Sequence, residues 1–155
     1  MNALDLSNPV FAAYVICAAL LVLKMVATSW LTVYRMIRAN GGMRNPEDAN
    51  PGLANPRPRE GQLDPVDDVD RVRRIHQNDL ENLLPFLAIG WLYVITSPDP
   101  TLARVLFYGY VVSRLLHSAA YLAARPHEWR AALWSVGTFI LIGMAMMTLW
   151  AGLNA

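Results

Sequence analysis

Four blocks of apolar residues, separated by polar segments, divide the 155-residue chain. About 20 helical residues cross the hydrocarbon core of a bilayer. The blocks therefore predict membrane-spanning helices at about 9–34, 69–96, 101–122 and 131–153. The second block is uninterruptedly apolar only over 83–95, but a helical pattern of apolar positions extends it back to 69. The pattern predicts a single domain over 1–155, an all-α integral membrane bundle of four transmembrane helices.

The segments between the blocks indicate the topology. Residues 39–68 are rich in Gly, Pro, Asn and Asp, which predicts a surface loop, and the run from Thr96 to Pro100 predicts a tight turn. Four spans place both termini on one side of the membrane and loops one and three on the other. Most of the 13 basic residues lie in or beside loops one and three. The positive-inside rule assigns that side to the cytoplasm.

The composition agrees with a multi-pass membrane protein. Hydrophobic residues make up 55% of the chain and charged residues 16%, compared with about 45–50% and about 25% in soluble domains. The single cysteine, Cys17, excludes a disulfide within the chain and a cysteine-built zinc site. No other metal-binding motif is evident, so we expect no metal. A net charge of +1 and the lack of a basic tail give no indication of nucleic-acid binding.

Two polar ridges interrupt the apolar pattern, with residues spaced three or four apart so that each ridge occupies one helical face. The ridge on span two consists of Arg71, Arg74, Asn78 and Glu81. The ridge on span three consists of Arg114, His117 and Tyr121. Ionisable groups at membrane depth are costly and usually face a partner or a wet cavity. Because arginines outnumber acids on these ridges, we expect a bound anion; the alternative is that Glu81 neutralises Arg74 or Arg114 within the bundle.

The residue types indicate the chemistry of that anion. Several arginines favour a carboxylate or a phosphate, and a glutamate beside them indicates that the ligand also carries an amine. Glutathione, which has two carboxylates, one ammonium group and a thiol, fits this inventory. A peptide or a zwitterionic lipid head group fits nearly as well.

Several motifs resemble those of the type 1 microsomal glutathione transferases of the MAPEG superfamily. The central ones are Asn45-Pro46-Glu47-Asp48, the segment 71–82 and Pro85-Phe86. Others are Pro98-Asp99-Pro100, Arg114-Leu115-Leu116-His117, Ala120-Tyr121-Leu122 and Arg130-Ala131. The resemblance covers all four spans in order. It implies a homotrimer that binds glutathione, as a co-substrate, between neighbouring subunits.

The resemblance also implies roles for individual residues. The expected glutathione contacts are Arg73, Arg74, His76, Asn78, Glu81 and Tyr121, with Arg114 and His117 lining the pocket. Arg35 resembles an arginine at the end of span one, although its distance from Lys24 is one residue shorter than in the family, so Arg38 is the alternative. Arg130 resembles the arginine beside the sulfur, and Asp48 an acid with a supporting role in prostaglandin synthase relatives. Both are expected to act in catalysis.

The implied function is a membrane-bound glutathione S-transferase that conjugates glutathione to hydrophobic electrophiles from the lipid phase. Glutathione peroxidase activity on lipid hydroperoxides is a further expectation. One alternative is a glutathione-dependent isomerase like prostaglandin E synthase, against which Ala131 counts because those enzymes carry serine there. The other is a non-enzymatic tetraspan protein that binds an anionic ligand or a partner helix. Ala49 stands where some type 1 transferases have an activating cysteine, so we expect little activation by thiol reagents.

Overall fold

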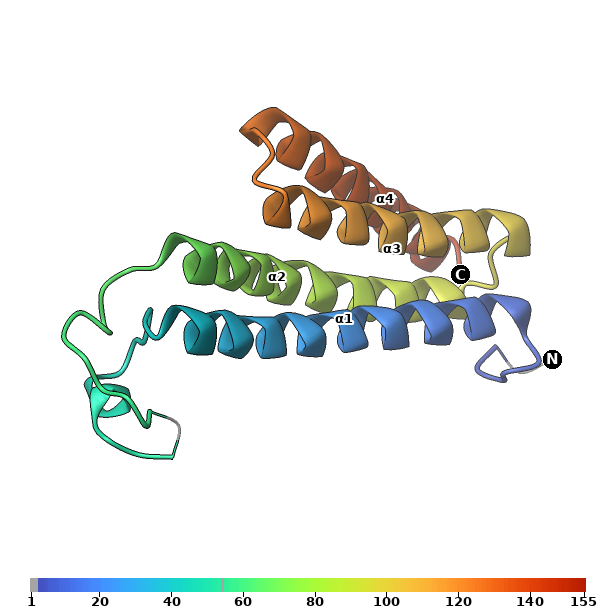
Figure 1. The fold of residues 1–155 in the computed structure, drawn as a ribbon. Coiled ribbons are helices and arrows are strands. Elements are labelled where there is room, and N and C mark those ends of the chain that lie inside the picture. The colour runs from blue at the N-terminus through green and yellow to red at the C-terminus, as the bar shows by residue number, and fades with distance from the viewer. Residues whose placement is uncertain (1–2, 54) are drawn as a thin grey trace.

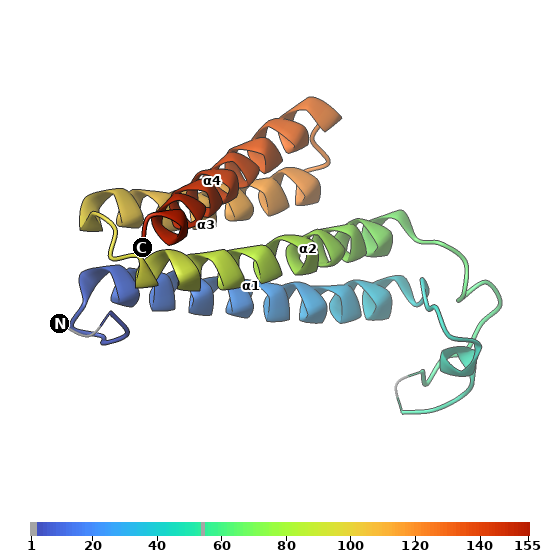
Figure 2. The same cartoon turned by 180° about the vertical axis from the view of Figure 1, so that it is seen from behind.

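The computed structural model describes residues 3–53 and 55–155, which form four antiparallel helices and no strand. The helices are α1 (Pro9–Ala39), α2 (Asp67–Ile95), α3 (Pro100–Leu122) and α4 (His127–Leu153), with a short 3-10 helix, η1 (Pro46–Ala49), between α1 and α2. α1 lies along α2, and α3 lies along α4 (Figures 1 and 2). Both termini are at one end, and the η1 loop and the α3–α4 turn are at the other. The predicted all-α, four-helix fold is confirmed.

Local sequence signals determine where the helices begin. The Asn8 side chain accepts a hydrogen bond from the Val10 N–H (2.9 Å), and Asp99 accepts from the N–H groups of Thr101 and Leu102. Each cap is followed directly by proline, whose fixed φ suits the first helical position. At the loop end the helices continue past the expected spans, because α1 runs to Ala39 and α4 begins at His127.

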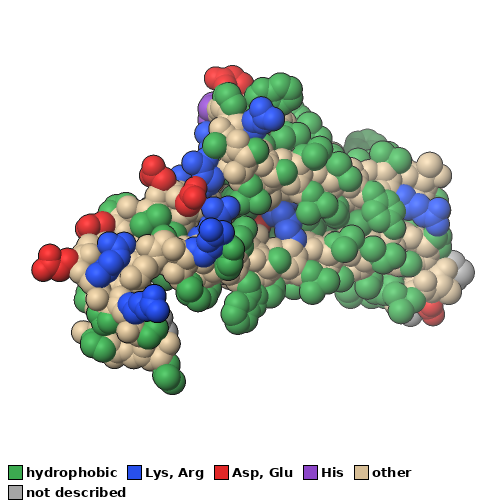
Figure 3. Space-filling model, in the orientation of Figure 1, with side chains coloured by type: hydrophobic (Ala, Val, Ile, Leu, Met, Phe, Trp, Pro, Cys, Tyr) green, Lys and Arg blue, Asp and Glu red, His purple; other side chains and the backbone are tan. Residues whose placement is uncertain are grey.

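The outer surface of the bundle is apolar. Among the described residues, α1 and α4 are long and apolar enough to cross a membrane, and α4 is largely uncovered. Its exposed large side chains include Phe139 and Trp150. Hydrophobic side chains cover most of the helical surface, and charged side chains gather mainly at the end with the η1 loop (Figure 3). Exposed apolar area on this scale indicates contact with lipid or with another subunit.

An aromatic core joins α1, α2 and α3. The rings of Phe86 and Tyr110 stack with their centroids 4.5 Å apart, and Tyr14 packs against both Phe86 and Phe107. The Tyr14 hydroxyl donates a hydrogen bond to the Leu87 carbonyl (2.9 Å). These contacts set the rotation of α2 relative to α1 and α3, and therefore determine where the polar residues of α2 lie.

Gly90 is expected to be a sensitive point of this core. A Cβ at Gly90 would lie 2.8 Å from Cε2 of Tyr14. Overpacking a core typically costs about 1–3 kcal/mol, which exceeds the gain of up to ~1 kcal/mol in helix propensity from Gly to Ala. Gly90→Ala should therefore lower the midpoint of thermal unfolding in detergent. Gly152→Ala on α4, where no atom lies within 4 Å of the added Cβ, is the control, and equal midpoints for the two variants would contradict the tight packing.

Candidate functional site

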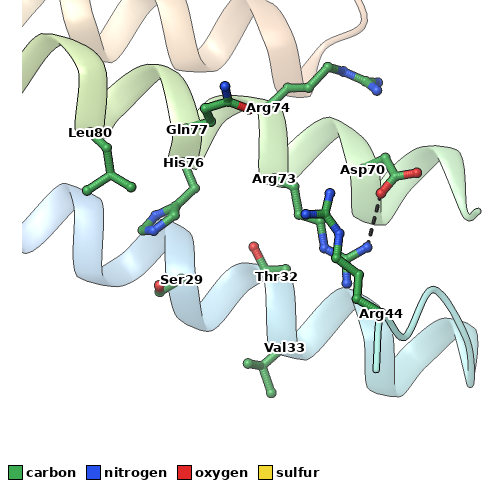
Figure 4. Close-up of a pocket in the computed structure, with 10 residues that line it drawn as sticks. All are labelled: Ser29, Thr32, Val33, Arg44, Asp70, Arg73, Arg74, His76, Gln77 and Leu80. Carbon is green, nitrogen blue, oxygen red and sulfur yellow. Dashed lines mark hydrogen bonds and ion pairs between the residues drawn. The ribbon is translucent and has the colours of Figure 1, made fainter. Parts of the chain in front are cut away.

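The predicted site residues fall mainly into two clusters. The first surrounds an open groove of about 610 Å³ between α1, α2 and the loop that joins them, here called the α1–α2 groove. Its lining includes Ser29, Thr32, Arg44, Arg73, Arg74 and His76 (Figure 4). The second, here called the interhelical cluster, consists of Asn78, Arg114, His117, Tyr121 and Arg130.

Within the α1–α2 groove, neighbouring residues of α2 point in different directions. Figure 4 shows Arg73 and His76 directed toward α1, whereas Arg74 extends away from it. Arg73 is already engaged, because it pairs with Asp70 (3.0 Å) and donates to the Gly42 carbonyl (2.6 Å). It therefore ties the loop to α2. The Nδ1 atom of His76 is buried and has no partner within the described residues.

The interhelical cluster forms a chain of contacts from α2 through α3 to α4. Arg114, which is 2% exposed, donates to the Asn78 side chain and lies 3.0 Å from Nδ1 of His117. The His117 ring meets the Tyr121 ring edge-on, with centroids 5.1 Å apart. The guanidinium of Arg130 lies over the Tyr121 ring, 4.5 Å from its centroid, in cation–π geometry. These contacts hold two arginines in defined positions without neutralising them.

Arg114 and Arg130 of the interhelical cluster, and Arg74 beside it on α2, form no ion pair within the described residues. In the part of the chain that the structure describes, no carboxylate lies within 4.0 Å of Arg74, Arg114 or Arg130. Nε and Nη1 of Arg114 and Nε of Arg130 are buried and have no hydrogen-bond partner among the residues that the structure describes. An unsatisfied buried donor is costly, and more so when it is charged. The described residues therefore leave these donors without the partner that an anionic ligand could supply.

Glu81 does not provide the missing negative charge. It is exposed on α2 and accepts a hydrogen bond from Gln77 (3.1 Å). The alternative that Glu81 neutralises Arg74 or Arg114 within the bundle is therefore wrong for the single chain. Its carboxylate faces outward, where a ligand or a neighbouring subunit can reach it.

The remaining predicted residues lie around the η1 loop. Arg35 pairs with Asp68 (3.1 Å), so it has its own acidic partner. Arg38 donates to the Tyr34 hydroxyl (3.1 Å), and together with Asp48 it lines a separate cavity of about 680 Å³. Figures 1 and 2 place η1 on the α1 side of the fold and the start of α4 on the opposite side. One chain therefore does not bring Asp48 and Arg130 together.

Two features of the site were not predicted from the sequence. Arg44 reaches the α1–α2 groove from the loop, and no sequence signal distinguishes it from the other loop arginines. Lys24 of α1 forms a buried ion pair with Asp79 of α2. For Lys24 the signal was present, because it is an isolated charge inside an apolar segment, whereas Asp79 lies in the polar run 71–82 and nothing in the sequence distinguishes it there.

Comparison with known proteins places these features in a family context. The model of the MAPEG family matches residues 14–150. The chain is 38% identical to human microsomal glutathione S-transferase 1 over 141 residues, which cover 90% of this chain and 89% of the relative. It is 33% identical to human prostaglandin E synthase over 149 residues, covering 96% and 94%. The rat microsomal glutathione S-transferase 1 is 35% identical over 140 residues, covering 90% and 89%.

Proposed function

Since the chain belongs to the MAPEG family of integral membrane proteins, we propose that it is a membrane-bound, glutathione-dependent enzyme, and specifically a glutathione S-transferase. The observation that carries this proposal is the set of buried, unpartnered guanidinium atoms on Arg114 and Arg130. A tripeptide with two carboxylates supplies the missing negative charge. The relatives named microsomal glutathione S-transferase 1 support glutathione as that tripeptide.

The proposed site lies between subunits of a homotrimer. Arg74 and Glu81 are exposed on α2 at membrane depth in the single chain, and such charges would meet lipid unless a neighbouring subunit covered them. The groove and the interhelical cluster lie on different sides of α2, so a second chain completes the site. The proposed glutathione contacts are Arg35, Arg73, Arg74, His76, Asn78, Glu81, Arg114, His117 and Tyr121.

The proposed chemistry depends on Arg130. A free thiol with a pKa of about 8.5 is mostly protonated at pH 7, and a nearby cation in a partly desolvated site favours the thiolate. The thiolate attacks an electrophilic carbon of a hydrophobic substrate that enters from the lipid. With an aryl halide, a carbon–sulfur bond forms, the halide leaves with its electron pair, and the thiol proton passes to solvent. Asp48, contributed by the loop of a neighbouring chain, is proposed to support this step.

Reduction of a lipid hydroperoxide is the second proposed reaction. It would consume two molecules of glutathione and release an alcohol, water and glutathione disulfide. The same thiolate would start it, by attack on the peroxide oxygen.

The second candidate function is a glutathione-dependent isomerase. It is supported by the relatives named prostaglandin E synthase, which match over nearly the whole chain. Ala131, directly after Arg130, counts against it because the serine expected of that enzyme is absent.

Loops one and three, which carry most of the arginines, are proposed to face the cytoplasm.

The test uses the full chain purified in detergent. Glutathione at 100 times its Kd should stabilise the protein by about 2.7 kcal/mol, visible as a higher unfolding temperature, and a chromogenic aryl halide should be conjugated. A glutathione analogue with a methyl group in place of the thiol should still stabilise the protein, but less than glutathione because it forms no thiolate beside Arg130, and it should give no conjugate. Stabilisation without turnover would favour the isomerase, to be assayed with an eicosanoid endoperoxide. Neither effect would favour a non-enzymatic tetraspan protein.

A further inference from the structure

Lys24 and Asp79 form an ion pair inside the bundle, and neither residue is among the proposed ligand contacts. The two side chains come from α1 and α2 and are 11% and 7% exposed. The Thr28 hydroxyl, which donates to the Lys24 carbonyl (3.0 Å), also lies 3.4 Å from Oδ2 of Asp79. Removing two charges from water is expensive, and pairing often does no more than offset that cost. A purely stabilising role is therefore a weak explanation for the pair.

Asp79 lies between two buried cations. Lys24, Asp79 and Arg114 line the same internal cavity, together with Asn82 and Tyr110. The cavity measures about 10 Å³, which is room for about one water molecule. Asp79 is the only carboxylate among the described residues of its lining, where it lies with both Lys24 and Arg114. A small rotation of its side chain would therefore offer Arg114 an internal counter-ion.

Such a rotation would remove the positive charge on which ligand binding depends. A guanidinium and a carboxylate form strong, often bidentate hydrogen bonds. Nε and Nη1 of Arg114, which now have no partner, would be occupied by Asp79. Lys24 prevents this exchange in the structure, because it holds the carboxylate on the α1 side.

We propose that Lys24 sets the affinity of the anion site by holding Asp79 away from Arg114. Lys24 is then a positioning residue that acts on the ligand without touching it. This inference rests on the proposed function, since it takes glutathione as the anion that Arg114 receives. It predicts that the two members of one ion pair affect ligand binding unequally, which a purely structural pair would not do.

The experiment compares Lys24→Met, Asp79→Asn and the double variant in the full-length trimer, with glutathione as the probe. Lys24→Met frees Asp79 to neutralise Arg114, so the Kd and the KM for glutathione should rise about tenfold while kcat stays within about twofold. Asp79→Asn leaves Arg114 charged and should keep the Kd within about twofold of the wild type. The double variant should regain the wild-type Kd. Lys24→Arg, which keeps a cation beside Asp79, should retain the wild-type Kd for glutathione.

Stability is measured separately, since either single variant breaks the buried Lys24–Asp79 ion pair and should lower the unfolding temperature. Equal increases in Kd for the two single variants, or an unchanged Kd in Lys24→Met, would overturn the inference while leaving the proposed function intact. If Lys24→Met fails to assemble, Asp79→Asn still tests the inference: a more than fivefold rise in its Kd for glutathione would overturn it. Failure of the wild-type protein to bind glutathione would overturn the proposed function and this inference with it.

Discussion

Arg130→Ala is expected to reduce the rate of aryl halide conjugation about 10- to 30-fold at neutral pH, while glutathione still binds; about 30-fold is the upper bound, because a thiol of pKa about 8.5 is still about 3% thiolate at pH 7. A nearby cation can lower a pKa by about 1–3, and a change of one in pKa changes the thiolate fraction about tenfold when most of the thiol is protonated. The Arg130 guanidinium is held over Tyr121, and its Nε is buried without a partner. Its removal takes away the charge that favours the thiolate and leaves the other arginines in place.

The sign of the pH dependence follows from the same charge. In the proposed role Arg130 stabilises the anionic thiolate, so the pKa of bound glutathione should lie below that of free glutathione in the wild type and return toward it in Arg130→Ala. Conjugation by the variant should therefore recover as the pH rises. The ultraviolet absorption of the bound thiolate, followed across the pH range, measures this directly.

Two variants serve as controls for Arg130. Arg130→Lys keeps a positive charge without the planar group that stacks on Tyr121, so it should retain an intermediate activity. Arg125→Ala, in the α3–α4 turn and exposed, should behave like the wild type. Wild-type thiolate absorption and turnover in Arg130→Ala would show that this arginine is not beside the sulfur.

Glu81→Gln is expected to raise the Kd for glutathione by about 10- to 100-fold and to leave kcat at saturation nearly unchanged. The Glu81 carboxylate is exposed and meets only the amide of Gln77 among the described residues, so it is available to an ammonium group. Hydrogen bonds to charged groups contribute about 1.5–3 kcal/mol, which corresponds to this range of Kd. Titration calorimetry or thermal shift in detergent measures it.

An altered ligand makes this test specific to the amine. N-acetylated glutathione, which lacks the ammonium group, should bind the wild type as weakly as glutathione binds Glu81→Gln. The variant should then show no further loss with the acetylated ligand, because a double-mutant cycle isolates the interaction that both changes remove. Glu60→Gln, in the exposed loop, is the matched control. Additive losses would indicate that Glu81 acts elsewhere.

The sequence predicted the elements of the fold well because each has a local cause. Apolar blocks, the turn over 96–100 and the Gly- and Pro-rich connection are all read over a few residues. The two polar ridges were also local, since spacing by three or four residues places side chains on one helical face. That Arg114 contacts Asn78 and His117 is consistent with these ridges.

The residues that each polar ridge contacts could not be predicted from the sequence in the same way. Arg73 and Arg74 are neighbours in the sequence, yet consecutive helical residues point about 100° apart, and only Arg73 reaches Asp70 and Gly42. Lys24 and Asp79 are 55 positions apart, and their pairing depends on how α2 is rotated against α1. Close packing of Gly90 on Tyr14 and the stacking of Phe86 on Tyr110 set that rotation. Such packing is a property of the assembled bundle.

The burial of Cys17 bears on how well the protein resists chemical modification. An enzyme with the proposed transferase activity would meet arylating compounds dissolved in the bilayer and would itself be a target for them, and a thiolate is the nucleophile that they react with most readily. The only sulfhydryl of this chain is 0% exposed, enclosed by the packed helices. With the proposed activity, this burial would protect the protein from alkylation of its own cysteine during turnover, as long as the bundle stays closed.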